Sequence, residues 1–306
     1  MGNGRWDASA WANYSATTIS GRSRRAIFTS NAMKDDYDPA KISLRESRDS
    51  DDNPQSTPII LAGDVTGSMG MVAEQLMRDG LNTLATEICD RKPVTDPHVM
   101  MMAIGDAYCD RAPLQVTQFE ADIRVAQQAR ELWLEGGGGG NQGESYMLAH
   151  LFAAMKVSAD AFEKRRRKGY LFTIGDEPVL DGATKDQIKR FLNIPVERDL
   201  SAREIMTMAQ RNWEVYHIVL VNEGYASRGL DDVLKSWRAL LPERTIQLDN
   251  VDALAEMVVS LIQVNEGARA ADVAASWSGS TAMVVANALK GVPAPAGQTA
   301  GLRFLD

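Results

Sequence analysis

Apolar runs without polar alternation recur along the middle of the chain. They stand at residues 59–63, 99–105, 170–175, 215–222 and, in a shorter form, 245–248. Strands that are covered on both faces have this pattern, which is typical of a parallel sheet between two layers of helices. Residues 113–120 instead alternate between apolar and polar side chains soon after the second run. They predict an antiparallel strand at one edge of the sheet.

The segments between these runs carry apolar residues at helical spacing. The stripes begin at Val72 and recur over residues 122–134 and 146–163, and Ser201 and Glu204 form a capping box before another helix. A final helix is expected after the last strand. This succession predicts an α/β fold: a doubly wound, mostly parallel six-stranded sheet of order 3-2-1-4-5-6, with the third strand antiparallel at an edge and helices on both faces.

The two ends of the chain differ from this central region in composition. We expect a polar N-terminal extension over residues 1–57, a doubly wound domain over 58–264 and an Ala/Gly/Pro-rich tail over 265–306. Residues 45–58 are so polar that they predict a solvated, extended lead-in. In the tail, residues 281–289 predict a short helix and residues 291–301 a flexible segment.

The charge balance favours some partners and disfavours others. The chain has 306 residues, 44% of them apolar, and a formal net charge of -8, so neither nucleic acid nor an anionic membrane is an expected partner. The basic cluster Lys164–Lys168 is expected to stay solvated at a helix end. Because the first residues lack an apolar core and no apolar run approaches about 18 residues, we expect a cytoplasmic protein.

Oxygen-bearing side chains cluster where two of the predicted strands end. Asp64, Thr66 and Ser68 follow the first strand at alternate positions, and Asp176 follows the fourth. In a sheet of the predicted order these two strand ends flank the point where the winding reverses, which is where ligands bind. Oxygen ligands suit a hard cation such as Mg²⁺, or Mn²⁺ or Ca²⁺ in its place.

A glycine-rich segment adds a third set of candidate ligands. Gly136–Gly140 is followed by Asn141, Glu144 and Ser145 and then by a predicted helix. Ordering five glycines costs considerable entropy, so a flexible linker is one interpretation. The polar residues that follow favour a loop that brings Asn141, Glu144 or Ser145 to the cation.

These three elements together resemble the von Willebrand factor A domain. The stretch Asp64-Val65-Thr66-Gly67-Ser68 resembles the DxSxS motif of its metal-ion-dependent adhesion site (MIDAS), and the resemblance extends over residues 58–264. The glycine-rich segment before Ser145 resembles the loop that supplies a Thr ligand in that family. Asp176 resembles the Asp at the end of its fourth strand.

The resemblance implies a ligand set and a function. Thr66, Ser68 and Ser145 would bind the cation through their hydroxyls, while Asp64 and Asp176 would act mainly through water. One coordination position would stay open for an Asp or Glu carboxylate of a partner protein. The chain would be an interaction module of the intracellular bacterial or phage type, not an enzyme, and a MoxR-type AAA+ ATPase would be a typical partner.

Two other interpretations remain open. Gly105, Asp106 and Asp110 resemble a second motif of haloacid-dehalogenase-type phosphatases, in which Asp64 would be the nucleophile and Mg²⁺ would be held by Asp106 and Asp110. We favour turn formation for Asp106 and Asp110. The third interpretation is a structural or assembly protein with a vestigial metal site.

Overall fold

A six-stranded, mostly parallel sheet forms the centre of the molecule. The computed structural model describes residues 4–137 and 143–292, and within them not the side chains of Ser68 and Asp79. Five strands of the sheet are parallel: β2 (Thr57–Asp64), β3 (Pro97–Ile104), β6 (Gly169–Gly175), β9 (Trp213–Leu220) and β10 (Thr245–Leu248). The sixth strand, β4 (Leu114–Val116), pairs antiparallel with β3, as its alternating pattern predicted.

The sheet order is β4-β3-β2-β6-β9-β10. If only these six strands are counted along the chain, the order reads 3-2-1-4-5-6. Four further short strands lie outside the sheet in two separate pairs, and the sequence did not predict them. They are β1 (Arg45–Ser47) with β5 (Val157–Ala159), and β7 (Gly182–Ala183) with β8 (Leu200–Ser201). β3 lies on one side of β2 and β6 on the other, so the winding of the sheet reverses at β2. Because β2 and β6 are parallel neighbours, their carboxyl ends lie next to each other.

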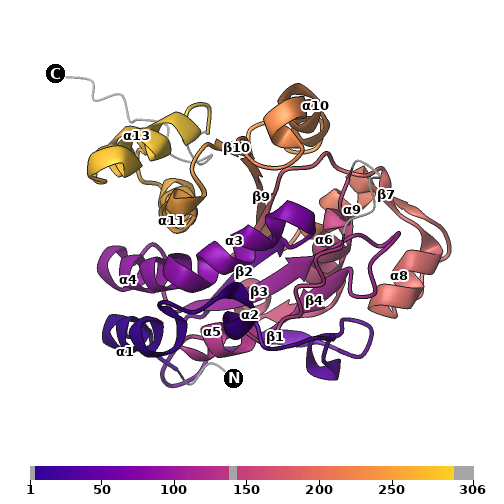
Figure 1. Ribbon diagram of the computed structural model, residues 1–306, viewed down its shortest axis with the longest axis horizontal. Helices are drawn as coiled ribbons and strands as arrows, with labels where there is room; N and C mark the ends of the chain where they lie inside the picture. Colours follow the sequence, from indigo (N-terminus) through magenta and orange to yellow (C-terminus); the bar gives the residue numbers. More distant parts are fainter. Residues whose placement is uncertain (1–3, 138–142, 293–306) are drawn as a thin grey trace.

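Helices cover both faces of the sheet, as predicted (Figure 1). One face packs against α1 (Ala8–Tyr14), α3 (Gly70–Gln75), α4 (Leu81–Arg91), α5 (Arg124–Ala129), α11 (Leu254–Asn265), α12 (Ala270–Ala275) and α13 (Gly279–Ala288). The opposite face packs against α6 (Tyr146–Met155), α8 (Lys185–Leu192), α9 (Ala202–Ala209) and α10 (Ala226–Arg238). Alternate residues of β2 enter the two cores, with Ile59 and Leu61 in one and Ile60 and Ala62 in the other.

Several predicted helices have different limits in the structure. The stripe that begins at Val72 continues through a π-helical turn, η4 (Leu76–Gly80), between α3 and α4. The stripe over 146–163 is not one helix, because β5 interrupts it between α6 and α7 (Asp160–Arg165). The capping box of Ser201 and Glu204 is present at α9, whereas α8 was not predicted.

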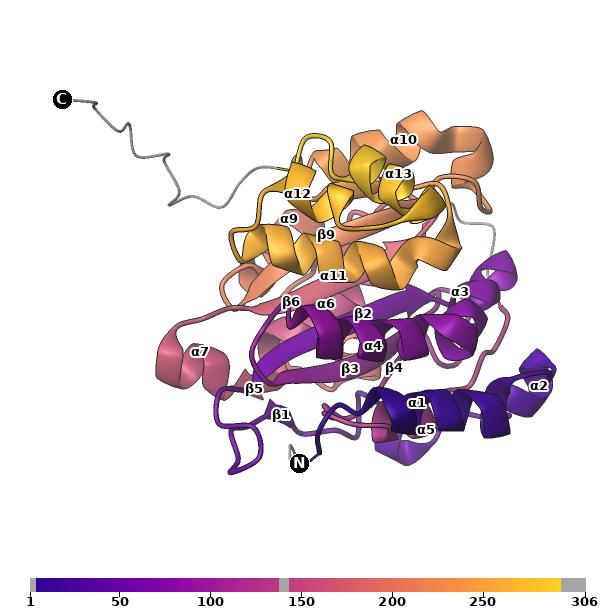
Figure 2. The same ribbon diagram turned by 90° about the vertical axis from the view of Figure 1, so that its left-hand side faces the viewer.

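The N-terminal region packs on the domain. Trp11 of α1, Ile19 of the π-helical η1 (Ser15–Ile19) and Ile27 of α2 (Arg24–Ile27) are buried in the same core as α4. Figure 2 shows α1, α4 and α11 side by side over this face of the sheet. The short 3₁₀ helix η2 (Asp35–Tyr37) then leads toward β1.

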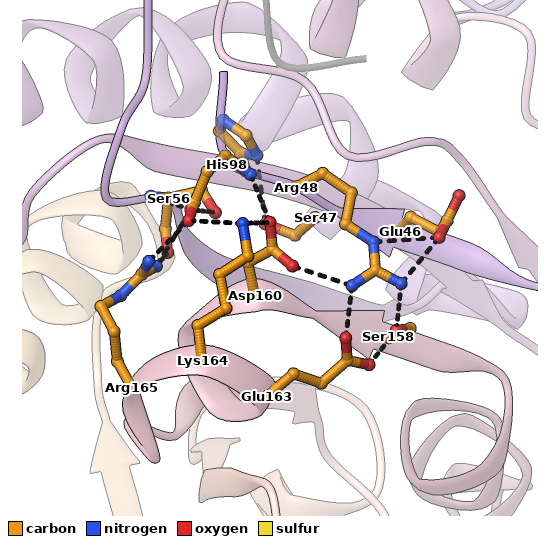
Figure 3. A network of polar contacts seen from close by, with 11 residues as sticks. Glu46, Ser47, Arg48, Ser56, His98, Ser158, Asp160, Glu163, Lys164 and Arg165 are labelled. Atoms are coloured by element: carbon orange, nitrogen blue, oxygen red, sulfur yellow. Dashed lines mark hydrogen bonds and ion pairs between the residues drawn. The ribbon is translucent and has the colours of Figure 1, made fainter. Parts of the chain in front are cut away.

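The prediction of a solvated lead-in at residues 45–58 was wrong. Arg45 and Ser47 of β1 are buried, and the segment is fastened by a network of ion pairs (Figure 3). Arg48 donates hydrogen bonds to Glu46, Asp160 and Glu163. The sequence of this segment alone suggests exposure to solvent. In the structure, its charged side chains form ion pairs with oppositely charged residues of a helix that lies far away in sequence.

The basic cluster Lys164–Lys168 provides part of that network, so the prediction that it is merely solvated was also incomplete. Arg165 and Lys164 contact the carboxylate of Asp49. Lys164 also pairs with Asp160, and Arg167 pairs with Glu266. These ion pairs bind the cluster to other segments of the same chain.

The C-terminal region begins as a folded layer. After β10, the 3₁₀ helix η5 (Val251–Ala253) leads into α11, and α12 and α13 pack against α11. The helix predicted at residues 281–289 corresponds to α13. The flexible segment predicted at 291–301 lies mostly outside the described residues. Among the described helices, none has the length and apolar character needed to cross a bilayer.

Candidate metal site at the carboxyl ends of β2 and β6

Asp64 and Thr66 form the centre of the candidate site. Asp64 ends β2 with its side chain fully buried, and its Oδ1 accepts hydrogen bonds from the backbone N–H and the hydroxyl of Thr66, both at 2.8 Å. The turn continues through Gly67, whose φ of +39° favours glycine, into the 3₁₀ helix η3 (Gly67–Met69). Ser68 lies on this turn, but its side chain is outside the described atoms.

The start of α6 brings two further side chains to this turn. Glu144 Oε1 accepts a hydrogen bond from the Thr66 hydroxyl at 3.0 Å. The phenolic O–H of Tyr146 donates to Asp64 Oδ2 at 3.2 Å. Each oxygen of Asp64 therefore has a donor, and the Thr66 hydroxyl lies between two buried carboxylates.

Gly175 makes room for the Tyr146 phenol. A Cβ atom at this position, the last of β6, would lie 1.9 Å from the Tyr146 hydroxyl oxygen. Any side chain here would therefore push the phenol away from Asp64. This close approach explains why glycine stands directly before Asp176.

The flanks of the glycine-rich segment are held at the same edge of the sheet. The carbonyl of Gly137 accepts a hydrogen bond from the Gly67 N–H at 2.7 Å. The Glu135 carboxylate accepts from the backbone N–H groups of Arg111 and Ala112. Asn141, one of the three candidate loop ligands, lies outside the described residues.

Ser145 and the turn at 105–110 form a separate hydrogen-bonded unit. The Ser145 hydroxyl oxygen accepts from the Ala107 N–H at 2.8 Å. Asp106 Oδ1 accepts from the Tyr108 N–H, and Asp110 Oδ2 accepts from the Asp106 N–H, both at 2.8 Å. The expectation that Asp106 and Asp110 form a turn is confirmed. Ser145 braces that turn, while its neighbour Glu144 contacts Thr66.

Asp176 lies beside this cluster, on the strand next to Asp64. β2 and β6 pair in register with Gly63 opposite Ile174, so Asp64 and Asp176 both emerge at the same edge. Asp176 Oδ2 accepts a hydrogen bond from the Tyr225 N–H, just before α10, and its Oδ1 is buried without a partner. The two acidic strand ends are therefore neighbours, although no hydrogen bond of the described residues joins them.

The electrostatics of the site disfavour ionised carboxylates in the absence of a cation. Burial raises the pKa of Asp64 to about 8, with a further increase from the charges of Asp176 and Glu177. Burial likewise raises the pKa of Glu144 to about 9, with Asp64 as the next cause. Burial also raises the pKa values of Asp176 and Glu177. All four carboxyl groups change in the direction that a cation would reverse.

The donor set fits a hard cation. At this site, two buried carboxylate oxygens lack a hydrogen-bond partner among the described residues, Glu144 Oε2 and Asp176 Oδ1. Within residues 4–137 and 143–292, no three His, Cys, Asp or Glu side chains converge as a metal-binding group. Among the described residues, the cation would be held, directly or through water, by Asp64, Thr66 and Glu144, with Asp176 beside them. One or two carboxylates, completed by water, are what Mg²⁺ usually takes from proteins.

An aromatic cluster supports the site from below. Tyr146 makes edge contacts with His217 and Trp237, whose rings stack with centroids 3.5 Å apart. The indole N–H of Trp237 donates to the Glu177 carbonyl at 3.0 Å. His217 is buried and shares a hydrogen bond with Thr173, which agrees with the role of a core residue. The sequence patterns did not indicate that Tyr146 and Trp237 lie at the site.

Comparison with known proteins gives no family for this chain. No protein-family model matches the sequence, and no curated protein does. Among solved structures, the pilus adhesin SpaC from Lactobacillus rhamnosus GG in its open conformation is similar with a TM-score of 0.45 and 11% identity, over 73% of this chain and 31% of the adhesin. A second structure of that adhesin gives 0.46 and 13%, over 73% and 32%. The chain spans about a third of the length of these structures.

Proposed function

We propose that this chain is a metal-ion-dependent protein-interaction module of the von Willebrand factor A type. It would hold one divalent cation, Mg²⁺ or in its place Mn²⁺ or Ca²⁺, above the carboxyl ends of β2 and β6. When bound, the cation would act as a Lewis acid that attracts an Asp or Glu carboxylate of a partner protein. The proposal includes a cytoplasmic location and a non-enzymatic role, with a MoxR-type AAA+ ATPase as an expected partner.

One observation carries the proposal: the Thr66 hydroxyl lies between two buried carboxylates, those of Asp64 and Glu144. Buried carboxylates are costly unless they are protonated or paired with positive charge. Among the described residues, no Lys or Arg lowers the pKa of either Asp64 or Glu144. A divalent cation would supply the missing charge.

The central test is cation binding by Asp64→Asn. This substitution keeps the shape of the side chain but removes its charge. Loss of an outer-shell partner already costs metal affinity roughly 10–100-fold, so loss of Asp64 should cost at least as much. Titration calorimetry with MgCl₂ and MnCl₂ measures this, with the exposed Asp181→Asn as a control. Equal cation affinity in Asp64→Asn and the natural chain would refute the assignment.

Two further measurements separate this function from its alternatives. If the chain were a phosphatase, it would hydrolyse a generic phosphate ester with Mg²⁺, and Asp64→Asn would abolish turnover. If it were a structural protein with a vestigial site, capture of its partner would survive EDTA. The interaction module predicts no turnover and EDTA-sensitive capture.

A further inference from the structure

We propose that Glu144 is a direct ligand of the cation and that it is the residue by which the loop before α6 contributes to the site. This inference rests on the proposed function, since it assigns a ligand within the same site. It replaces a hydroxyl ligand from the loop, expected at Ser145, with a negatively charged one. Asn141, the third candidate, plays no part in the argument.

Thr66 contacts two carboxyl groups of the site. Its hydroxyl oxygen lies 2.8 Å from Asp64 Oδ1 and 3.0 Å from Glu144 Oε1. A threonine hydroxyl has one proton, so without a cation it can satisfy both neighbours only if one of the two carboxyl groups is protonated. A cation bound to the lone pairs of this oxygen and to Glu144 leaves the proton free for Asp64. All three groups are then satisfied at once.

One carboxylate oxygen of Glu144 has no hydrogen-bond partner within the described part of the chain. The side chain is 3% exposed, and its Oε2 is buried with no hydrogen-bond partner. Buried polar atoms in proteins are nearly always paired, so an unpaired carboxylate oxygen beside a hydroxyl and a second carboxylate indicates a missing ligand. Glu144 is fixed in place by a bridge between its backbone and Val179.

Ser145 is hydrogen-bonded to a different turn from the one that carries Thr66. Its hydroxyl oxygen accepts from the Ala107 N–H, and its own N–H donates to the Gly105 carbonyl at 3.2 Å. Both groups of Ser145 thus brace the turn at 105–110. Glu144, one residue earlier, is the loop residue that contacts Thr66.

This assignment has a consequence for the partner. When ionised, Asp64 and Glu144 together already balance the charge of one divalent cation, before the nearby Asp176 and Glu177 are counted. The isolated chain should therefore bind the cation without a partner. The partner's carboxylate would meet a site whose charge is already neutralised, so its affinity must depend on contacts beyond the cation.

The experiment compares Glu144→Gln with Glu177→Gln in the full chain. Both substitutions remove one half-buried or buried negative charge near the site, but only Glu144 contacts Thr66. We expect Glu144→Gln to weaken Mn²⁺ binding, counted by the paramagnetic resonance signal of free Mn²⁺, by roughly tenfold or more. Glu177→Gln should change it by much less, and circular dichroism should confirm that both variants are folded.

Each outcome bears on a different claim. A large loss in Glu144→Gln alone supports direct ligation. Equal losses in both variants would mean that Glu144 acts only through its charge, and no loss would remove it from the site; either overturns the inference while the proposed function stands. If the natural chain binds no Mn²⁺, the proposed function itself fails.

Discussion

Tyr146 links the aromatic core to the candidate site at the scale of a single residue. Its phenol donates to Asp64 Oδ2, and its ring makes edge contacts with the stacked pair of His217 and Trp237. Because Tyr146 is held by this packing, its hydrogen bond fixes the orientation of the Asp64 carboxylate. Oδ2 of Asp64 then faces Tyr146, and Oδ1 accepts from Thr66. Tyr146 is thus a positioning residue, because it would act on the cation through Asp64.

Removal of the Tyr146 hydroxyl should weaken cation binding without unfolding the chain. We expect Tyr146→Phe to lower Mn²⁺ affinity by roughly tenfold, as for other outer-shell partners of a metal. Tyr170→Phe is the matched control, because that buried phenol donates to Glu266 on another element. Titration calorimetry of the two variants measures the difference. If Tyr170→Phe lost as much affinity, the effect would be a general loss of packing.

The same residues show what the sequence could and could not predict about the site. Asp64, Thr66 and Asp176 were predictable, because strand ends that flank a winding reversal share one edge of the sheet. The pairing of Tyr146 with Asp64 was not, since it depends on the distance between helix α6 and strand β2. The glycine at 175, which lets the phenol approach, has a meaning only once that distance is known.

At the scale of elements, long-range ion pairs decide the position of the segment around β1. Arg48 and Asp49 pair with residues of α7 that are more than a hundred positions away. Asp160 is the centre of this contact: it is nearly buried and accepts from Arg48, Lys164 and the Asp49 N–H. Sequence patterns find buried apolar strands, but they contain no signal for charged partners at this separation.

Asp160→Ala should loosen this segment. The change leaves the Asp49 N–H without its acceptor and removes one of the carboxylate partners of Arg48, which costs about 1–3 kcal/mol of unfolding free energy. Glu204→Ala in the exposed pair with Arg198 is not a suitable control, because Glu204 also caps α9. Arg198→Ala is, since its pair with Glu204 is solvated and should contribute little to stability.

Urea unfolding measures the difference between these two variants, and limited proteolysis reports where the chain opens. In Asp160→Ala, new cleavage should appear within residues 45–56. Equal stability of Asp160→Ala and Arg198→Ala would show that the network holds the segment no more firmly than a surface pair does.

At the scale of the whole molecule, the cost of burying several carboxyl groups at one site must lower the free energy of unfolding. Asp64 and Glu144 have pKa values near 8 and 9 in the folded chain, well above those of unfolded carboxyl groups. At pH values between the unfolded and the folded pKa, the folded state binds more protons than the unfolded state. The unfolding free energy without metal therefore falls as the pH rises through this range. The buried His98 acts in the opposite sense: its lowered pKa of about 4 costs stability only below about pH 6.5.

Calorimetric unfolding between about pH 7.5 and 8 therefore reports mainly on the buried carboxyl groups of the site, because the buried histidines His98, His150 and His217 are almost neutral there in both states. In EDTA, we expect the unfolding free energy to fall with pH by on the order of 1 kcal/mol per unit for each group. Millimolar Mg²⁺ should reduce or reverse this slope, because the cation binds the ionised carboxylates that the metal-free fold disfavours. The Asp64→Asn variant should show a shallower slope in EDTA and little response to Mg²⁺. A stability that is independent of pH in EDTA would contradict the raised pKa values, and an identical slope with Mg²⁺ would contradict cation binding at this site.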